Sequence, residues 1–141
     1  MPQHTLSMDS KGSASTAISA YQVIPILRVA SVATAVAWYA KLGFKHNWTH
    51  RFGPTFPAFA EISNANMKLY LSEHTGDARP GTLLFLHVPD VDAFVAELEG
   101  VMPENSTELG LRDCEVQDPD GNRLRIGSEI GKGRGFKLED S

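Results

Sequence analysis

Apolar and polar positions in the first half of the chain predict a strand, a helix and three further strands. The run Gln22–Val29 is apolar and β-rich, and Pro25 inside it favours an edge strand or a strand that leaves its own subunit. Ser31 is a suitable N-cap for a helix over Val32–Leu42, whose apolar stripe recurs at helical spacing, and Gly43 is a suitable stop. The strands expected next are Phe44–His50, Ala58–Ser63 and Met67–Glu73, with a turn at Asn64–Asn66 between the last two.

The second half of the chain repeats this order. The segment VASVATAVAWY, which starts at Val29, is echoed by VPDVDAFVAEL from Val88, and each copy follows a short apolar run. Duplicated strand–helix units of this kind indicate two similar modules. The elements expected here are a strand Leu83–Val88, a helix Val91–Glu99 capped by Asp90, a weak strand within Gly100–Leu109, and strands Arg112–Gln117 and Arg123–Ser128 around the turn Asp118-Pro119-Asp120-Gly121.

Composition narrows the class of protein. The 141 residues carry thirteen basic and seventeen acidic side chains, a formal charge of −4 that disfavours a nucleic-acid partner. A single cysteine, Cys114, excludes an intramolecular disulfide and a cysteine-rich zinc site. No apolar stretch reaches the roughly 18 residues of a membrane span, and no signal peptide is evident, so we expect a cytoplasmic protein without membrane contact. Residues 1–20 and 129–141 are expected to be flexible tails around a single domain, 21–128.

Three segments together resemble a known superfamily: LRVASVATAVAWYAKLGF (27–44), LHVPDVDAFVAEL (86–98) and DPDGNRLRI (118–126). They are similar to the vicinal oxygen chelate superfamily, which includes glyoxalase I, extradiol dioxygenases, fosfomycin resistance enzymes and bleomycin resistance proteins. The resemblance implies an α+β fold in which two βαβββ modules, 21–74 and 82–128, form a cupped, partly open mixed β-barrel with flanking helices (the glyoxalase/bleomycin resistance fold). It also implies a homodimer, with strands or modules shared between chains.

Enzymes of this superfamily usually hold a divalent metal through four strand positions. Carried onto this chain by its motifs, those positions are Ile24, Tyr70, Leu83 and Arg125. Aliphatic side chains offer no lone pair, and a guanidinium repels a cation, so we expect the inherited metal site to be absent and no cofactor to be bound.

What remains is a concave, largely apolar site, which suits a flat aromatic or amphipathic ligand. Without a metal, the chain resembles bleomycin resistance proteins, which are dimers that sequester a drug in clefts between subunits without chemistry on it. The aromatic candidates could stack on a ligand or seal the dimer interface. Arg125 could clamp an acidic group of a ligand, remain solvated at the barrel mouth, or pair with Glu61. The expected ligand-binding residues are Trp48, Phe52, Phe56, Phe59, Tyr70, Phe85 and Arg125.

Two other interpretations stay open. The chain could be a metal-dependent lyase or dioxygenase-like enzyme with a rearranged metal site, for which His50, Glu61 and Glu73 are the candidate ligands. It could also be a ligand-sensing or purely structural dimer. The DPDGNR turn is expected only to build a hairpin, without chemistry.

Overall fold

The structure is a computed structural model that describes residues 20–106 and 108–130, so most of the two expected tails lies outside the described residues. The chain folds into two four-stranded sheets, which we call the N-terminal sheet (order β1-β4-β3-β2) and the C-terminal sheet (order β5-β8-β7-β6). The elements in chain order are β1 Ile26–Arg28, α3 Val32–Ala40, β2 Lys45–Arg51, β3 Ala58–Asn64, β4 Met67–Ser72, β5 Leu83–His87, α4 Val91–Phe94, β6 Glu104–Ser106, β7 Leu111–Gln117 and β8 Arg123–Glu129.

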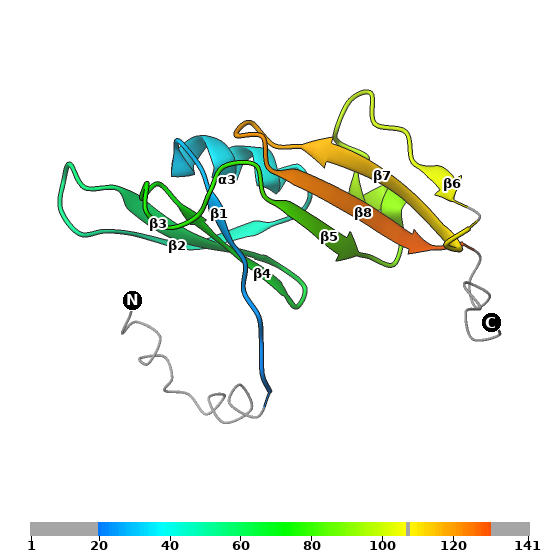
Figure 1. Cartoon of the computed structure of the whole chain (residues 1–141), viewed down its shortest axis with the longest axis horizontal. Helices are drawn as coiled ribbons and strands as arrows, with labels where there is room; N and C mark the ends of the chain where they lie inside the picture. Colours follow the sequence, from blue (N-terminus) through cyan, green and yellow to red (C-terminus); the bar gives the residue numbers. More distant parts are fainter. Residues whose placement is uncertain (1–19, 107, 131–141) are drawn as a thin grey trace.

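The internal repeat predicted from the sequence is present in the strand pairing. In each sheet the first and last strands of the module run parallel, with Ile26 opposite Tyr70 in one and Phe85 opposite Arg125 in the other. All other strand neighbours are antiparallel. The predicted α+β fold of two βαβββ modules is confirmed. Within the described residues the two sheets share no strand pairing, so one chain closes no barrel, and they lie side by side (Figure 1).

Local sequence signals fix the first helix. Ser31 has an extended backbone, and its Oγ accepts the N–H of Thr34 at 3.1 Å, as an N-cap should. Gly43 follows the last turn with a φ of +86°, a left-handed conformation that costs glycine little and ends the helix. The helix ends at Ala40, two residues before the expected end.

The second helix is shorter than predicted. Asp90 caps it by accepting the N–H of Ala93 at 3.2 Å, but α4 spans only Val91–Phe94, where a helix to Glu99 was expected. The amides of Ala96 and Leu98 donate to carbonyls three residues back, so the chain continues in tighter turns instead of an α-helix. The apolar spacing that suggested a longer helix is real, because Val95 is buried in these turns.

The first strand is also shorter than the predicted Gln22–Val29. The Pro25 carbonyl accepts the N–H of Tyr70 at 2.9 Å, but proline has no N–H to donate in return. The strand itself therefore begins at Ile26. β1 lies at the edge of its sheet, as Pro25 favoured. Residues 20–23 continue beyond β1 as an unpaired arm, on which the side chains of Tyr21 and Val23 are almost fully exposed (Figure 1).

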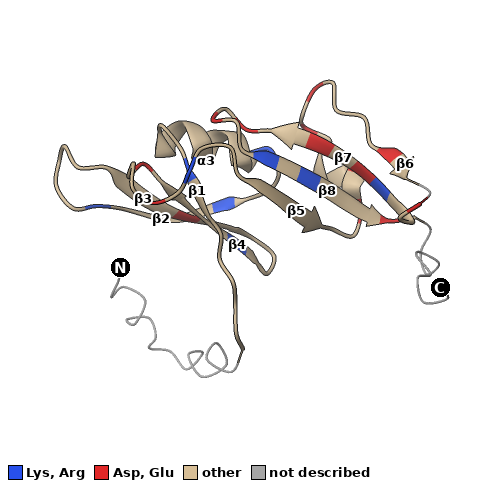
Figure 2. Ribbon diagram, viewed as in Figure 1, with Lys and Arg blue, Asp and Glu red and all other residues tan. Residues whose placement is uncertain are grey.

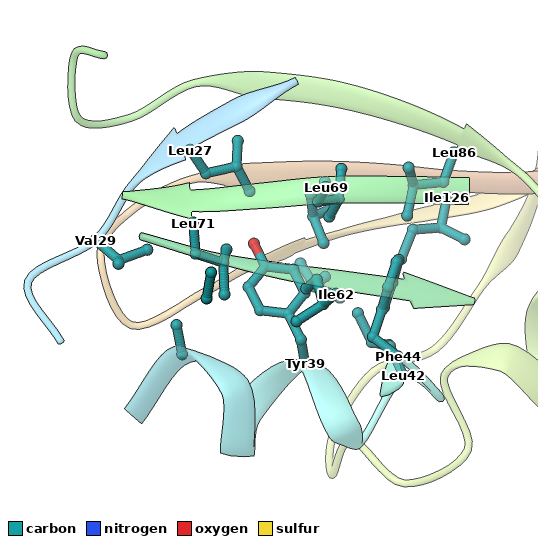
Figure 3. Packing of buried hydrophobic residues seen from close by; sticks show 14 of the residues in the cluster. Leu27, Val29, Tyr39, Leu42, Phe44, Ile62, Leu69, Leu71, Leu86 and Ile126 are labelled. Carbon is teal, nitrogen blue, oxygen red and sulfur yellow. The ribbon is translucent and has the colours of Figure 1, made fainter. Parts of the chain in front are cut away.

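One hydrophobic core connects the two modules. Tyr39 and Leu42 pack against the inner face of the N-terminal sheet, to which Leu71 belongs. Ile126 from the C-terminal sheet is part of the same cluster (Figure 3). The rings of Phe44 and Phe94, one from each module, make an edge contact with centroids 6.5 Å apart. Burying each large apolar side chain contributes about 1.5–3 kcal/mol, so the shared core favours a fixed arrangement of the modules.

A buried polar network adds a second connection between the modules. Asp118 is only 4% exposed, and its carboxylate accepts a hydrogen bond from the Tyr39 hydroxyl at 2.8 Å. This bond joins the turn of the second module to the helix of the first. The same carboxylate accepts the backbone amides of Asp120 and Asn122 and the side-chain amide of Asn122. Burial of Tyr39 and, secondarily, the charge and hydrogen bond of Asp118 raise the pKa of the tyrosine far above its ordinary value.

Asn122 and Asp120 extend the network to the residues at the end of β1. The Asn122 side chain donates to the carbonyl of Arg28 at 3.2 Å and accepts the amide of Thr82 at 3.0 Å. The carboxylate of Asp120 accepts the amide of Ala30 at 2.9 Å. The DPDGN turn therefore does more than the predicted hairpin: it ties Arg28 and Ala30 of the first module to the turn and to Thr82 of the second module.

Candidate functional site

The outer face of the N-terminal sheet, which points away from α3, carries an aromatic cluster. Three neighbouring strands contribute one ring each: Trp48 from β2, Phe59 from β3 and Tyr70 from β4. Ring centroids lie 6.3 Å apart for Trp48–Phe59, 6.0 Å for Trp48–Tyr70 and 5.1 Å for Phe59–Tyr70. Because cross-strand neighbours share a face, these rings form one apolar platform on that face.

A carboxylate lies between two of these rings. Glu61 is the cross-strand partner of both Trp48 and Tyr70, and its side chain is only 12% exposed. Its Oε2 accepts the side-chain amide of Asn47 at 2.8 Å, and its Oε1 lies 3.9 Å from the Lys68 ammonium. Burial and, secondarily, the nearby Glu61 charge raise the pKa of the Tyr70 hydroxyl, so that group remains a neutral donor.

The outer face of the C-terminal sheet has a different chemistry. Glu115 on β7 bridges two arginines of β8, with 3.0 Å from Oε1 to Arg125 Nε and 3.3 Å from Oε2 to an Arg123 terminal nitrogen. Figure 2 shows the basic residues of β8 beside the acidic residues of β7. The hydrogen bond from Arg125 is the main cause that holds the pKa of the Glu115 carboxyl below its ordinary value. Arg125 therefore pairs with Glu115, and the suggested pairing with Glu61 is wrong.

Phe85 lies next to this charged group. It is opposite Arg125 across β5 and β8, and it is 49% exposed. Its ring reaches over Gly127, where an added Cβ would approach the ring to 3.2 Å. The absence of a side chain at Gly127 thus leaves room for the Phe85 ring on the sheet surface.

The structure brings together only part of the predicted ligand-binding set. Trp48, Phe59 and Tyr70 form the platform on the N-terminal sheet, while Phe85 and Arg125 are neighbours on the C-terminal sheet. Phe52 and Phe56 are exposed in the loop between β2 and β3 and belong to neither group. Phe52 packs against His50, with ring centroids 4.3 Å apart.

Two residues of the site were missed by the sequence reasoning. Asn47 is the extra residue of a bulge between His46 and Trp48, and a bulge cannot be read from alternation alone. Glu115 could have been found from the sequence, because it lies two residues from Asp113 and from Gln117 and so shares one polar face of the predicted strand with them. The hairpin register then places it opposite Arg125.

The four positions to which the resemblance assigned the metal ligands do not offer the chemistry of a divalent-cation site. Ile24 and Leu83 are aliphatic, and Tyr70 lies within the aromatic cluster. Arg125 carries a permanent positive charge and is paired with Glu115. Carboxylate or imidazole ligands are lacking at all four positions, so no step of a reaction can be assigned to a metal held there.

The alternative zinc ligands do not converge either. Both oxygens of Glu73 accept backbone amides, from Val32 at 2.8 Å and Ala58 at 3.0 Å. Although burial alone would raise its pKa, these hydrogen bonds hold the pKa of the Glu73 carboxyl below its ordinary value. In residues 20–106 and 108–130, no group of three or more His, Cys, Asp or Glu side chains could hold a metal ion, so His50, Glu61 and Glu73 form no such cluster.

Comparison with known proteins agrees with this fold. A family model described as glyoxalase superfamily protein matches residues 8–133. The chain belongs to the glyoxalase superfamily. A search of curated protein sequences gave no match. None of the helices in the described part of the chain is long and apolar enough to cross a membrane.

Several solved structures are similar to this chain in fold over most of its length. A bleomycin-binding protein in complex with bleomycin shares 20% identity and a TM-score of 0.61, over 78% of this chain and 99% of that one. A bleomycin resistance determinant encoded on the transposon Tn5 shares 20% identity and a TM-score of 0.62, over 78% and 98% of the two chains. An antibiotic-binding protein from Streptomyces sp. CB03234 shares 24% identity and a TM-score of 0.63, over 79% and 98%.

Proposed function

We propose that this protein is a metal-free binding protein that holds a small aromatic or amphipathic molecule, such as an antibiotic of the bleomycin type. The observation that carries the proposal is the aromatic platform of Trp48, Phe59 and Tyr70 on an outer sheet face. The lack of donor groups at the four metal positions supports binding without metal chemistry. Two of the similar structures are described as antibiotic-binding or bleomycin-binding proteins, which also supports it.

The binding cleft we propose is formed by two copies of the chain. In one copy the aromatic platform and the Phe85–Arg125 group lie on different sheets, so each face is open. Apolar side chains remain exposed on these faces and on the arm before β1, including Ile26 at 39% and Leu83 at 41%. A second copy would cover this surface and enclose a ligand, because apolar area gains free energy when it leaves water. We expect a homodimer by light scattering after size exclusion, and a monomer at micromolar concentration would argue against the cleft.

The biological role follows from mass action. A protein that binds a drug without converting it lowers the free drug concentration in the cytoplasm, where we place it. Protection then depends on the amount of protein relative to drug and on the affinity. This distinguishes the proposal from an enzyme, because the bound molecule is recovered unchanged.

The test is a calorimetric titration of metal-analysed protein with bleomycin, with and without copper. We expect saturable binding near one drug molecule per chain, in protein without stoichiometric metal. Trp48→Leu and Phe59→Leu should each weaken binding by about tenfold, whereas Phe56→Leu, outside the cluster, should not. Absence of binding would remove the bleomycin-type assignment, and stoichiometric metal in the purified protein would refute the metal-free proposal.

A further inference from the structure

A row of hydrogen-bond donors crosses the outer face of the N-terminal sheet, beside the aromatic platform. Ser63 on β3 is the cross-strand partner of both Lys45 on β2 and Lys68 on β4, so all three side chains share that face. The Asn47 side-chain amide joins the row by donating to Ser63 Oγ at 3.0 Å. The row lines a cavity of about 650 Å³, to which the arm 20–23 also contributes.

The charges of this cavity favour an anion. Its charged lining residues are Lys45, Lys68 and Glu61. Glu61 is already engaged, because Asn47 donates to one oxygen and Lys68 faces the other. The Lys68–Glu61 distance of 3.9 Å exceeds a direct hydrogen bond, and Lys45 makes no ion pair with any described residue. The charged groups that remain available to hydrogen-bond a ligand in this cavity are therefore the two lysine ammonium groups.

The donor row and the aromatic platform are spaced to bind two parts of one molecule. Lys68 and Tyr70 are two residues apart on β4, and Ser63 and Glu61 are two residues apart on β3. Two residues along a strand span about 6.6 Å, so adjacent rows of one face lie that far apart. A ring on Trp48 or Tyr70 would carry a substituent to the lysines without leaving the sheet surface.

We propose that the ligand is an aromatic anion whose ring lies on the Trp48–Phe59–Tyr70 platform and whose acidic group binds the row Lys45–Ser63–Lys68. This inference rests on the proposed binding of an aromatic molecule and narrows its charge class: an acidic aromatic compound would be the better ligand, and a cationic drug such as bleomycin the weaker one. An ammonium donates to a carboxylate or phosphate oxygen through a charge-assisted hydrogen bond, which is stronger than a neutral one. Both N–H groups of the Asn47 amide are already donated, to Glu61 and to Ser63, so Ser63 supplies the neutral donor between the two charges through its own O–H.

The experiment compares three probes with the same ring: 2-naphthoate, neutral 2-naphthamide and the cation 2-naphthylmethylammonium, each titrated calorimetrically into the full chain at low salt. We expect naphthoate to bind about tenfold more tightly than naphthamide, and the cation more weakly than both. Equal affinities, or tighter binding of the cation, would overturn the anion assignment. If Trp48→Leu still weakens those probes, the proposed binding face stands; if none of the three binds, the proposed function fails with it.

Matched substitutions locate the anion site. Lys45→Gln should weaken naphthoate by about tenfold and leave naphthamide unchanged, and it does not strip an ion pair from Glu61. Lys68→Gln should act in the same direction. The control Lys41→Gln removes an equal charge at the C-cap of α3, which packs on the opposite side of the sheet from this row, and it should leave all affinities unchanged. An equal loss in Lys41→Gln and Lys45→Gln would refute a local site.

Discussion

The contact between Tyr39 and Asp118 gives the sharpest test of how the two modules are held together. The Tyr39 side chain is fully buried, and its hydroxyl donates to Asp118 Oδ2 at 2.8 Å. Tyr39→Phe removes one oxygen and keeps the ring that packs against Phe44, at a centroid distance of 5.8 Å. The substitution therefore probes the hydrogen bond and leaves the hydrophobic core nearly unchanged.

The expected loss follows from the partners that remain. Asp118 keeps three donors in the variant, two on Oδ1 and the Asn122 amide on Oδ2, so the carboxylate is not left bare. A hydrogen bond to a charged group contributes about 1.5–3 kcal/mol, and the retained donors place the expected loss near the lower end, about 2 kcal/mol. For a domain of this size that lowers the melting temperature by roughly 5–10 °C.

The assay is denaturant unfolding of wild type and variant at pH 7, followed by circular dichroism. Tyr70→Phe is the matched control, because it removes the same atom from the outer face, where the hydroxyl has no hydrogen bond to a described residue; we expect a change below about 0.5 kcal/mol. A Tyr39→Phe variant as stable as Tyr70→Phe would refute the reasoning. In a double-mutant cycle with Asp118→Asn, a coupling energy near zero would have the same consequence.

Three further substitutions test other parts of the structure. Gly43→Ala should destabilise by about 2 kcal/mol, since φ is +86° and the new Cβ would meet the Asn64 side-chain nitrogen at 2.8 Å. Gly100→Ala, also at positive φ but with open space around it, should cost only about 1 kcal/mol. If thermal unfolding showed the same loss of stability for both variants, the clash with Asn64 would not contribute. Glu73→Gln should cost about 1–3 kcal/mol at pH 7, because the neutral amide accepts on one oxygen only. The Glu73 pKa is lowered from 4.5, so this stabilisation is present above that pH and lost below it; wild type and variant should converge in stability as the pH falls. A gap independent of pH would disprove the assignment.

Much of the fold could be predicted because its signals are local. The caps Ser31 and Asp90 and the stop Gly43 act on amides and dihedral angles within a few residues, and the structure places them as expected. Alternation along β3 and β8 likewise reports which side chains face the core. The lengths of β1 and α4 were wrong, since they depend on which amides find partners, and apolar spacing does not contain that information.

The candidate site could be predicted only in part, because its members come from different strands. The sequence singled out Trp48, Phe59 and Tyr70, but their mutual contact depends on the register of three strands. The bulge at Asn47 adds one residue to β2 and so places Trp48 on the same face as Lys45, where strict alternation would separate them. A single extra residue thus decides whether the lysine and the ring can contact one ligand.

By itself, the sequence determined the repeated βαβββ order and the absence of carboxylate and imidazole groups from Ile24, Tyr70, Leu83 and Arg125, the positions to which the resemblance assigned the metal ligands. These are properties of residue type and short-range spacing. The tertiary structure alone decided that Arg125 pairs with Glu115 and that Asp118 accepts a hydrogen bond from Tyr39. It also decided that both carboxylate oxygens of Glu73 accept hydrogen bonds from backbone amides. The physical reason is that a charged side chain pairs with whichever group the packed chain brings within about 3 Å, and that proximity is set by strand register and module packing.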